Sequence, residues 1–535
     1  MPANKDVKEP ESGAGVKERS QIRASSEQKR VNWDFVRVTQ QWTFRSTSTD
    51  ATRHRPRGIM ASRRRKILET ETMQILPPAP SPIRDLPLEV LATIFVWAIV
   101  DTWHSSTSCC DDLLKFMLVC HQWRDAAQSS PTVWSTINVI LVRTARATRG
   151  ASRQARQLAA VETYLRRSGQ VPLKISISGT ELYPADKILQ RLVAHSARWK
   201  TLNIKLTLVT TLRSMPSVVQ GNIPWLTTLA LSHNESEEDH FAGSEYDPAF
   251  VTFEDAPSLR TLEFISWPMP ATLRLPWSQI GHLSAQKLSP YDCLQLMKAA
   301  PNLTSCEFTV RRADSRDPMH PPGVFVAEHL QSFTLRSEEN FSLHSLARLL
   351  DSTTFPTLDV LEIHGPQPLK PSEFEFIPDI DRALFSVIQR SNCSIDRLKL
   401  VHVPFSESGL VAIIVSLGSL RYLEIDALNT SPLGLDFLGA LVSDGRLKGS
   451  NNLPRLGHLR LACDLEKETE SEFEKLADVL ESRRAAFTYS YGEVLPLESW
   501  GEYPSDLIAR LRILSSGGMK IQINGEDLIG MNFET

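Results

Sequence analysis

Residues 420 to 425 read LRYLEI, and this short phrase decides the fold because it recurs along most of the chain. It consists of an apolar residue, two variable residues, a second apolar residue, one variable residue and a third apolar residue. Its copies begin 21 to 37 residues apart, which overlaps the period of about 20 to 29 residues known for short strand-containing repeats. The copies begin at Trp199, Leu226, Leu259, Leu303, Leu330, Leu358, Ile395, Leu420 and Leu456, with a weaker one at Ile280.

The phrase predicts a β-strand, because its last two apolar residues alternate with a variable one and so lie on the same face. Segments with helical periodicity separate the copies, for example KILQRLVAHS (187–196) and GLVAIIVSLG (409–418). A strand-helix unit repeated in one direction builds a parallel sheet, and the wider helices bend it into a solenoid. The predicted fold class is therefore α/β, with parallel strands inside and helices outside.

This unit resembles the leucine-rich repeat, and the resemblance covers residues 171 to 535. The asparagine of the standard repeat is absent, so an ordinary α/β domain with leucine-rich strands stays open as the alternative. In leucine-rich repeats the variable residues of the phrase face the concave side, which would serve as a binding surface. The residues expected there include Arg260, Thr261, Glu263, Asp359, Val360, Glu362, Arg421, Tyr422 and Glu424.

Three short helices are predicted upstream, where residues 83 to 100 read IRDLPLEVLATIFVWAIV. The first begins after Pro87, whose missing N–H is harmless in a first turn, and Glu89 faces the positive end of the helix dipole. The second is predicted at 111–117 and the third at 120–128. Some 50 residues cannot bury this much apolar surface, so the segment is expected to dock onto a partner.

This segment resembles the F-box at fourteen positions in order: Leu86, Pro87, Glu89, Val90, Leu91, Ile94, Phe95, Val119, Cys120, Trp123, Arg124, Ala127, Val133 and Trp134. The gap between Phe95 and Val119 is longer than in the shortest F-boxes. The resemblance implies a three-helix F-box at residues 83–137 that holds the Skp adaptor, which in turn holds a cullin and a ubiquitin-conjugating enzyme.

The residues expected to contact the adaptor are Leu86, Pro87, Leu91, Ile94, Leu118 and Trp134. A packing role, in which Phe95, Trp123 and Trp134 only hold the helices together, stays open. Residues 138–170 are expected to form a connecting helical segment. Around its end, LRRSGQVPLKISIS (165–178) resembles a segment that follows the F-box in many proteins of mushroom-type fungi.

The N-terminal leader differs from the rest of the chain in charge. Residues 1 to 80 hold 16 Lys and Arg against 9 Asp and Glu, a net +7, and the remainder holds 43 against 53, a net −10. Residues 1–58 are predicted to be a disordered basic leader and 59–82 a short helix and a proline-rich linker. An acidic body argues against nucleic-acid binding.

The leader MPANKDVKEPESG lacks the apolar core of a secretory signal, and the longest apolar run, VLATIFVWAIV (90–100), is half the ~20 residues that a membrane span needs. No membrane partner is therefore expected. Seven scattered cysteines without a CxxC pair favour reduced thiols and a cytoplasmic or nuclear location, and no metal site.

No phosphate-binding loop, dinucleotide fingerprint, HExxH or GxSxG motif occurs, so no catalytic residue, cofactor or enzymatic activity is expected. The predicted function is the substrate receptor of a Skp-cullin-F-box ubiquitin ligase, with an unknown protein substrate bound by the repeat domain. Arg421, Tyr422 and Glu424 are the favoured substrate-binding residues, because Arg and Tyr are enriched at binding hot spots. Two alternatives are a scaffold that acts outside a ligase and an enzyme using Glu493, Glu498 and Glu502.

Overall fold

A computed structural model of the chain describes residues 86–101, 109–141, 147–179, 187–206, 219–233, 251–267, 273–311, 323–337, 343–366, 378–426, 434–442, 453–462, 470–483, 488–492, 505–516, 520–523 and 526–527. The basic leader, the proline-rich linker and the carboxylates Glu493, Glu498 and Glu502 lie outside these ranges. The chain divides into two compact units, Met1–Thr102 and Trp103–Thr535.

The described part of the first unit is one helix, α2 (Leu88–Asp101). It begins directly after Pro87, whose carbonyl accepts hydrogen bonds from the backbone N–H groups of Val90 and Leu91. Glu89 lies in the first turn, as expected from the helix dipole. The Thr93 hydroxyl donates a hydrogen bond to the carbonyl of Glu89 at 2.8 Å, so this polar side chain has a partner within the helix.

The second unit opens with two short helices and a single 3-10 turn: α3 (Cys109–Val119), α4 (His121–Ser129) and η2 (Pro131–Trp134). Both helices lie within two residues of the predicted ranges. Phe116 and Trp123 join α3 to α4 through an edge-to-face contact with ring centroids 6.1 Å apart. Arg124 Nε donates to the carbonyl of Met117 at 3.1 Å and so ties the two helices together.

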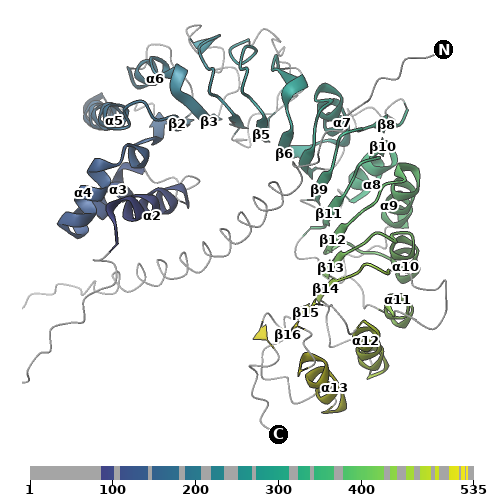
Figure 1. The fold of residues 1–535 in the computed structure, drawn as a ribbon. Coiled ribbons are helices and arrows are strands. Elements are labelled where there is room, and N and C mark those ends of the chain that lie inside the picture. Colours follow the sequence, from purple (N-terminus) through teal and green to yellow (C-terminus); the bar gives the residue numbers. More distant parts are fainter. Residues whose placement is uncertain are drawn as a thin grey trace, which may run out of the picture. The chain divides into compact units, whose positions relative to one another are not determined.

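Among the described residues, one long sheet forms the body of the second unit, with fifteen strands hydrogen-bonded in chain order (Figure 1). All neighbours are parallel except β16 and β17, and β8 (Phe325–Val326) and β10 (Thr353–Thr354) form a separate parallel pair. The strands of the long sheet are β1 (Thr136–Leu141), β2 (Leu173–Gly179), β3 (Trp199–Leu206), β4 (Thr228–His233), β5 (Thr261–Ile265), β6 (His282–Leu288), β7 (Ser305–Val310), β9 (Ser332–Ser337), β11 (Val360–His364), β12 (Arg397–Val401), β13 (Tyr422–Asp426), β14 (His458–Ala462), β15 (Thr488–Gly492), β16 (Lys520–Ile523) and β17 (Glu526–Asp527).

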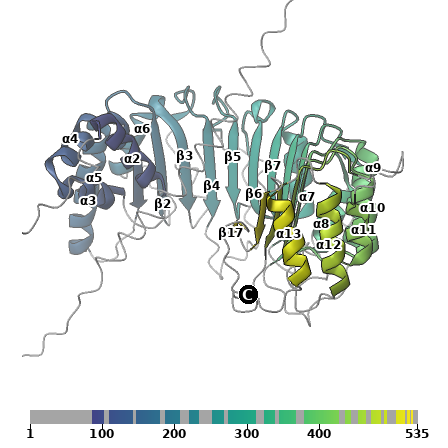
Figure 2. The ribbon, with the colours of Figure 1, turned by 60° about the horizontal axis from the view of Figure 1, so that its bottom comes forward.

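Helices cover one face of this sheet, and Figure 2 shows α8 to α13 side by side on it. Consecutive helices from α7 to α13 pack against one another. Their bounds, with those of α5 and α6 and of two further 3-10 turns, are α5 (Ala147–Arg167), α6 (Lys187–Val193), η3 (Ser196–Arg198), η7 (Trp277–Gln279), α7 (Pro290–Ala299), α8 (Leu343–Asp351), α9 (Pro378–Ser391), α10 (Glu407–Val415), α11 (Leu435–Leu441), α12 (Glu470–Ser482) and α13 (Ser505–Ser516).

Each repeated phrase forms a strand of the long sheet, so the predicted parallel arrangement in one sheet is confirmed. The third apolar residue of every phrase is no more than 4% exposed, because alternation points it to the buried face. These residues are Ile204, Leu231, Phe264, Ala285, Phe308, Leu335, Ile363, Leu400, Ile425 and Leu461. Aromatic rings join neighbouring repeats. The Phe333 ring meets Phe308 edge-on with ring centroids 6.1 Å apart, and its centroid lies 4.9 Å from that of Phe355.

Arginines add polar links between successive repeats, Arg390 from an exposed position and Arg483 from a buried one. Arg390 Nη2 donates to the carbonyls of Leu350 and Thr353 at 2.8 and 2.9 Å, and Arg483 donates to those of Leu441 and Leu453. These carbonyls lie at or beyond helix ends, where no intrahelical donor is left. Burial lowers the pKa of the Arg483 guanidinium to about 10.

The sheet begins two strands earlier than the phrases predict. Residues 136–141 form β1, paired in parallel with β2, where a helical connection was expected from residue 138. In the described part of this connection, the helical residues are those of α5. The alternating TINVIL of β1 buries Ile137 and Val139, which is the strand periodicity that a helical interpretation of this short segment overlooks.

Candidate functional site

The first candidate surface is an apolar patch on α3. Leu114 and Leu118 are four residues apart and so lie on one side of the helix, 55% and 77% exposed, and Val119 is 59% exposed. Leu113, on the other side, is buried at 1%. Exposed leucines at this spacing are unusual on a solvated helix and are typical of a docking surface. We call Leu114, Leu118 and Val119 the α3 patch.

The predicted adaptor contacts divide into accessible and inaccessible residues. Pro87 and Leu118 are exposed, and Leu86 and Ile94 are partly exposed. Leu91 is only 1% exposed and Trp134 only 4%, so neither offers surface to a partner. Burial favours a packing role for these two residues, and the adaptor contacts stay a prediction for all six.

Trp134 is held inside the second unit by three groups. Its Nε1 donates to the carbonyl of Ala127 at 2.6 Å, its ring meets Tyr164 edge-on at 5.0 Å, and the Arg167 guanidinium lies 4.4 Å above it. A guanidinium over an indole ring is attracted to the negative face of the ring. The tryptophan therefore joins the end of α4 to α5, which is the packing alternative that the sequence left open.

Several exposed apolar residues were not predicted as contacts. Leu88, Val90 and Trp97 on α2 are 38%, 42% and 43% exposed, and Leu114 and Val119 extend the surface of α3 around Leu118. The sequence signal for them is apolar residues that do not belong to the i, i+3, i+4 stripe of their helix. Such residues add nothing to the buried face and are available to a partner.

The second candidate surface is the side of the sheet opposite the helices, which we call the open face. Its side chains form rows across the strands, because parallel register aligns equivalent positions. One row contains Lys174, Thr201, Thr228, Thr261, His282, Ser305, Ser332, Val360, Arg397, Tyr422 and His458. The next contains Ser176, Asn203, Ala230, Glu263, Ser284, Glu307, Thr334, Glu362, Lys399, Glu424 and Arg460.

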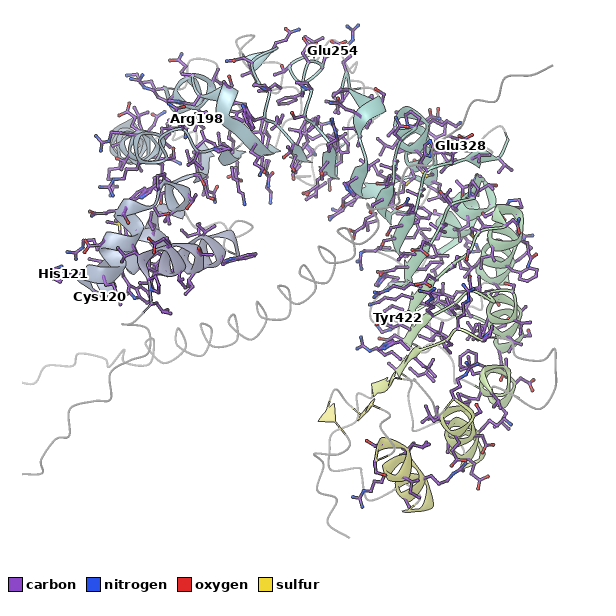
Figure 3. The ribbon with its side chains drawn as sticks, in the orientation of Figure 1. Cys120, His121, Arg198, Glu254, Glu328 and Tyr422 are labelled. Atoms are coloured by element: carbon purple, nitrogen blue, oxygen red, sulfur yellow. The ribbon has the colours of Figure 1, made fainter. Side chains whose placement is uncertain are left out.

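The open face changes in character along these rows. From β3 to β9 the first row holds mainly Ser and Thr, whereas from β11 to β14 the second row holds only charged residues of alternating sign. Figure 3 shows Tyr422 on β13 pointing away from the helix layer. Most of the residues predicted to face this side are exposed or partly exposed, and Glu424 alone is buried.

Glu424 lies at the centre of the charged part. Its Oε1 is 3.0 Å from both Lys399 Nζ and Arg460 Nη1, and its Oε2 accepts the Tyr422 hydroxyl at 2.7 Å. Burial alone would raise the pKa of this carboxyl, but the hydrogen bonds from Tyr422 and Lys399 and the two cationic charges outweigh it and hold the pKa below its ordinary value. Glu424 therefore stays ionised and saturated with partners from three strands.

Arg421 and Tyr422 have different surroundings. Arg421 pairs with Asp396 at 3.0 Å, and its side chain remains 63% exposed. Tyr422 is half-buried, and burial, followed by the hydrogen bond to Glu424, raises its pKa to about 12. The structure brings Tyr422 and Glu424 into direct contact, whereas Arg421 belongs to a separate ion pair.

A comparison with protein families identifies one region. Residues 83–139 match the F-box-like family. No curated protein matches the chain. F-box domains generally bind Skp adaptors, so an F-box-like domain indicates a role in substrate recognition by ubiquitin ligases. The match includes the three helices α2, α3 and α4 and therefore the α3 patch, and it ends within β1.

The described ranges contain neither a candidate metal site nor a candidate membrane span. Within them, no group of three or more His, Cys, Asp and Glu side chains could hold a metal ion. No helix described there is long and apolar enough to cross a membrane. Burial raises the pKa of the Cys293 thiol well above its ordinary value, and the same holds for Cys306, as expected for thiols inside a core.

Proposed function

We propose that this chain is the substrate-receptor subunit of a Skp-cullin-F-box ubiquitin ligase. The observation that carries the proposal is the α3 patch inside the F-box-like domain: three apolar side chains, 55% to 77% exposed, on an 11-residue helix. Burying them against an adaptor would remove apolar surface from water, which is the dominant favourable term in association. Through the adaptor the chain would reach a cullin and a ubiquitin-conjugating enzyme.

The body of the second unit would hold the protein substrate. We propose that its parallel sheet and single helix layer form a leucine-rich-repeat-like solenoid, as residues 165–178 and the repeated phrase suggest for a receptor of the mushroom-type fungal family. The open face would be the substrate-binding side, because its side chains project from a rigid sheet. The chain itself would be non-catalytic, without cofactor, and would act in the cytoplasm or nucleus by positioning a substrate lysine.

Adaptor capture tests this proposal. The full chain is mixed with purified Skp adaptor, and the complex is quantified by pull-down. Leu114→Asp with Leu118→Asp places two charges on the patch and should weaken capture by at least ~100-fold, since burying an unpaired charge is costly. Ile513→Asp is the matched control, because Ile513 is a 58% exposed apolar residue on α13, outside the F-box-like domain.

Equal capture by the double variant and the control would refute the adaptor surface. Co-purification of the complex with a cullin from cell extract then decides between a ligase subunit and a scaffold. Adaptor without cullin would favour the scaffold, and adaptor with cullin the receptor.

A further inference from the structure

Three arginines of the open face near β11 to β14 stand further out than the carboxylates with which they pair. On β11 to β14 and the residues preceding these strands, the Arg460 side chain is 50% exposed and its partner Glu424 only 7%. Arg421 is 63% exposed against 39% for Asp396, and Arg397 is 40% exposed against 22% for Glu362. A ligand approaching this surface therefore meets guanidinium groups first, although the cluster is close to neutral.

Arg397, one of these cations, is held in a fixed position by a stack of rings. Arg397, Tyr422 and His458 are direct neighbours in register on β12, β13 and β14. The Arg397 guanidinium lies 4.1 Å from the centre of the Tyr422 ring, and the Tyr422 and His458 rings are stacked 4.2 Å apart at an angle of 6°. A stacked guanidinium is pre-organised, because its face is covered while its N–H edge remains available to an anion.

One donor at this surface has no hydrogen bond within the chain. Arg397 Nε is buried, lies 3.6 Å from Glu362 Oε1 and makes no hydrogen bond. Because this Nε is buried while the Arg397 side chain is 40% exposed, a ligand that brings its own acceptor oxygens would pair with the rest of the guanidinium. Carboxylates and phosphates present such oxygens in the geometry that arginine binds best.

We propose that the platform formed by Arg397, Tyr422, His458, Arg421 and Arg460 binds an acidic segment of a partner protein through its carboxylate or phosphate groups. The proposal rests on the proposed function and names the class of substrate that the open face would take. Glu424 is a positioning residue here, because it is buried and holds the Tyr422 hydroxyl and Arg460 in place beneath the ligand. It replaces the expectation that Glu424 itself contacts substrate.

The geometry sets the spacing of the acidic groups. Arg397 and Arg460 lie two strands apart and two residues apart along the strands, which corresponds to about 12 Å between their Cα atoms. An extended peptide spans that distance over about four residues, at about 3.3 Å each. Both side chains lean toward β13, where the Arg397 guanidinium lies over Tyr422 and Arg460 Nη1 reaches Glu424, so the guanidinium groups lie closer together than the Cα atoms. Two acidic residues on one side of an extended peptide, at positions i and i+2 or i and i+4, would thus meet both arginines.

The test uses fluorescein-labelled peptides and the full chain, with affinity read from fluorescence anisotropy and adaptor capture measured separately on the same preparations. One peptide carries Glu at i and i+4 in a Ser/Gly background, a second carries phosphoserine at the same positions, and a third carries Lys there. Arg397→Gln with Arg460→Gln should weaken the acidic peptides by at least ~10-fold. Arg336→Gln is the matched control, because Arg336 lies on the same face, pairs with Glu307 at 2.7 Å and is 41% exposed, and it should change affinity less than ~2-fold.

The peptide measurements can support or overturn the proposed platform. Binding of both acidic peptides, or of the phosphorylated one alone, supports the platform and identifies the source of the anion. Equal binding of the Lys peptide, tighter binding of a single-stranded oligonucleotide, or an equal loss with Arg336→Gln overturns it. Glu424→Gln separates positioning from net charge: weaker binding supports positioning, and stronger binding, as charge alone predicts, refutes it.

Adaptor capture by the same preparations keeps this proposal separate from the proposed function. Captured adaptor without peptide binding would refute the acidic-segment proposal and leave the receptor role standing. Loss of adaptor capture in the unmodified chain would refute the receptor role, while peptide binding would still be measured on the open face.

Discussion

The α3 patch and the open face of β11 to β14 are both left uncovered by the described residues, yet they are built in opposite ways. The patch is apolar, and its residues are individually exposed to 55% or more. The open face is polar, and its central residue Glu424 is buried among partners from neighbouring strands. One surface contributes little to the stability of the chain, whereas the other is part of its structure.

Binding and stability are therefore coupled on the open face and separate on the α3 patch. Removing a leucine from the patch changes what a partner can bury and leaves the fold alone. Removing Glu424 leaves Lys399, Arg460 and the Tyr422 hydroxyl facing one another without an acceptor. A mutational scan that measures only binding would misinterpret the second loss as a lost contact.

The largest expected effect is on stability at Glu424. Glu424→Ala should lower the free energy of unfolding by about 3 kcal/mol, near the lower end for removing one partner of a buried charge cluster, because the arginine keeps access to water. Leu118→Ala should change it by less than ~0.5 kcal/mol, as usual for an exposed site. Urea unfolding followed by circular dichroism measures both.

Asp396→Ala is the control for Glu424→Ala on the same face, since Asp396 and its partner Arg421 are 39% and 63% exposed. A loss below ~0.5 kcal/mol is expected there. If Glu424→Ala and Asp396→Ala cost the same, the contrast between the buried cluster and an ordinary surface pair disappears.

The next effect is that of salt concentration, which should weaken binding by the open face more than binding by the α3 patch. Between about 50 and 500 mM NaCl the Debye length falls to less than half, so acidic-peptide binding to the open face should weaken by ~10-fold or more. Adaptor capture by the apolar patch should change by less than ~2-fold, because burial of apolar surface does not depend on charge screening. Equal salt dependence of the two would show that charges contribute to both surfaces.

Lowering the pH should then reveal how much the buried Glu424 carboxylate contributes to stability. The pKa of Glu424 is lowered in the folded chain, so its stabilising contribution is complete above its unfolded pKa of about 4.3 and is lost as pH falls through the folded value. The stability difference between the unmodified chain and Glu424→Gln should therefore shrink as pH drops below about 4.3. A difference that stays constant down to pH ~3 would contradict the lowered pKa.

Local patterns predicted most of the architecture because repeat strands depend on local alternation. Leu398 and Leu400, for example, pair in register with Leu423 and Ile425, as the repeated phrase requires. Helices α3 and α4 were also predicted to within two residues. Strand β1 was missed because its TINVIL begins inside the F-box-like segment, where a helical continuation was the simpler interpretation.

The site residues were harder to predict because their surroundings come from distant parts of the chain. Trp134 belongs to the F-box pattern, but its burial depends on Tyr164 and Arg167, some 30 residues further on. Glu424 alternates correctly with Leu423, yet Lys399 and Arg460 reach it from the two neighbouring strands and cover it. Alternation along a strand predicts the face of the sheet on which a side chain lies, but it does not predict the ion pairs that the side chain forms there.

The smallest expected effect concerns the Tyr422 hydroxyl. Tyr422→Phe removes one hydrogen bond to Glu424 and keeps the ring stacked on His458, so it should cost about 1 kcal/mol at neutral pH. Because the folded pKa is raised to about 12 from an ordinary value near 10, the tyrosine's contribution is complete below pH ~10 and is lost as pH rises toward about 12. Burial and Glu424 raise this pKa, while Arg397 and Arg460 oppose the rise.

The stability difference between the unmodified chain and Tyr422→Phe should therefore vanish between pH ~10 and ~12, and a spectrophotometric titration of the variant should lose one late-titrating tyrosine. If the variant instead loses a tyrosine that titrates near pH 10, the hydroxyl is open to water and Glu424 does not hold it.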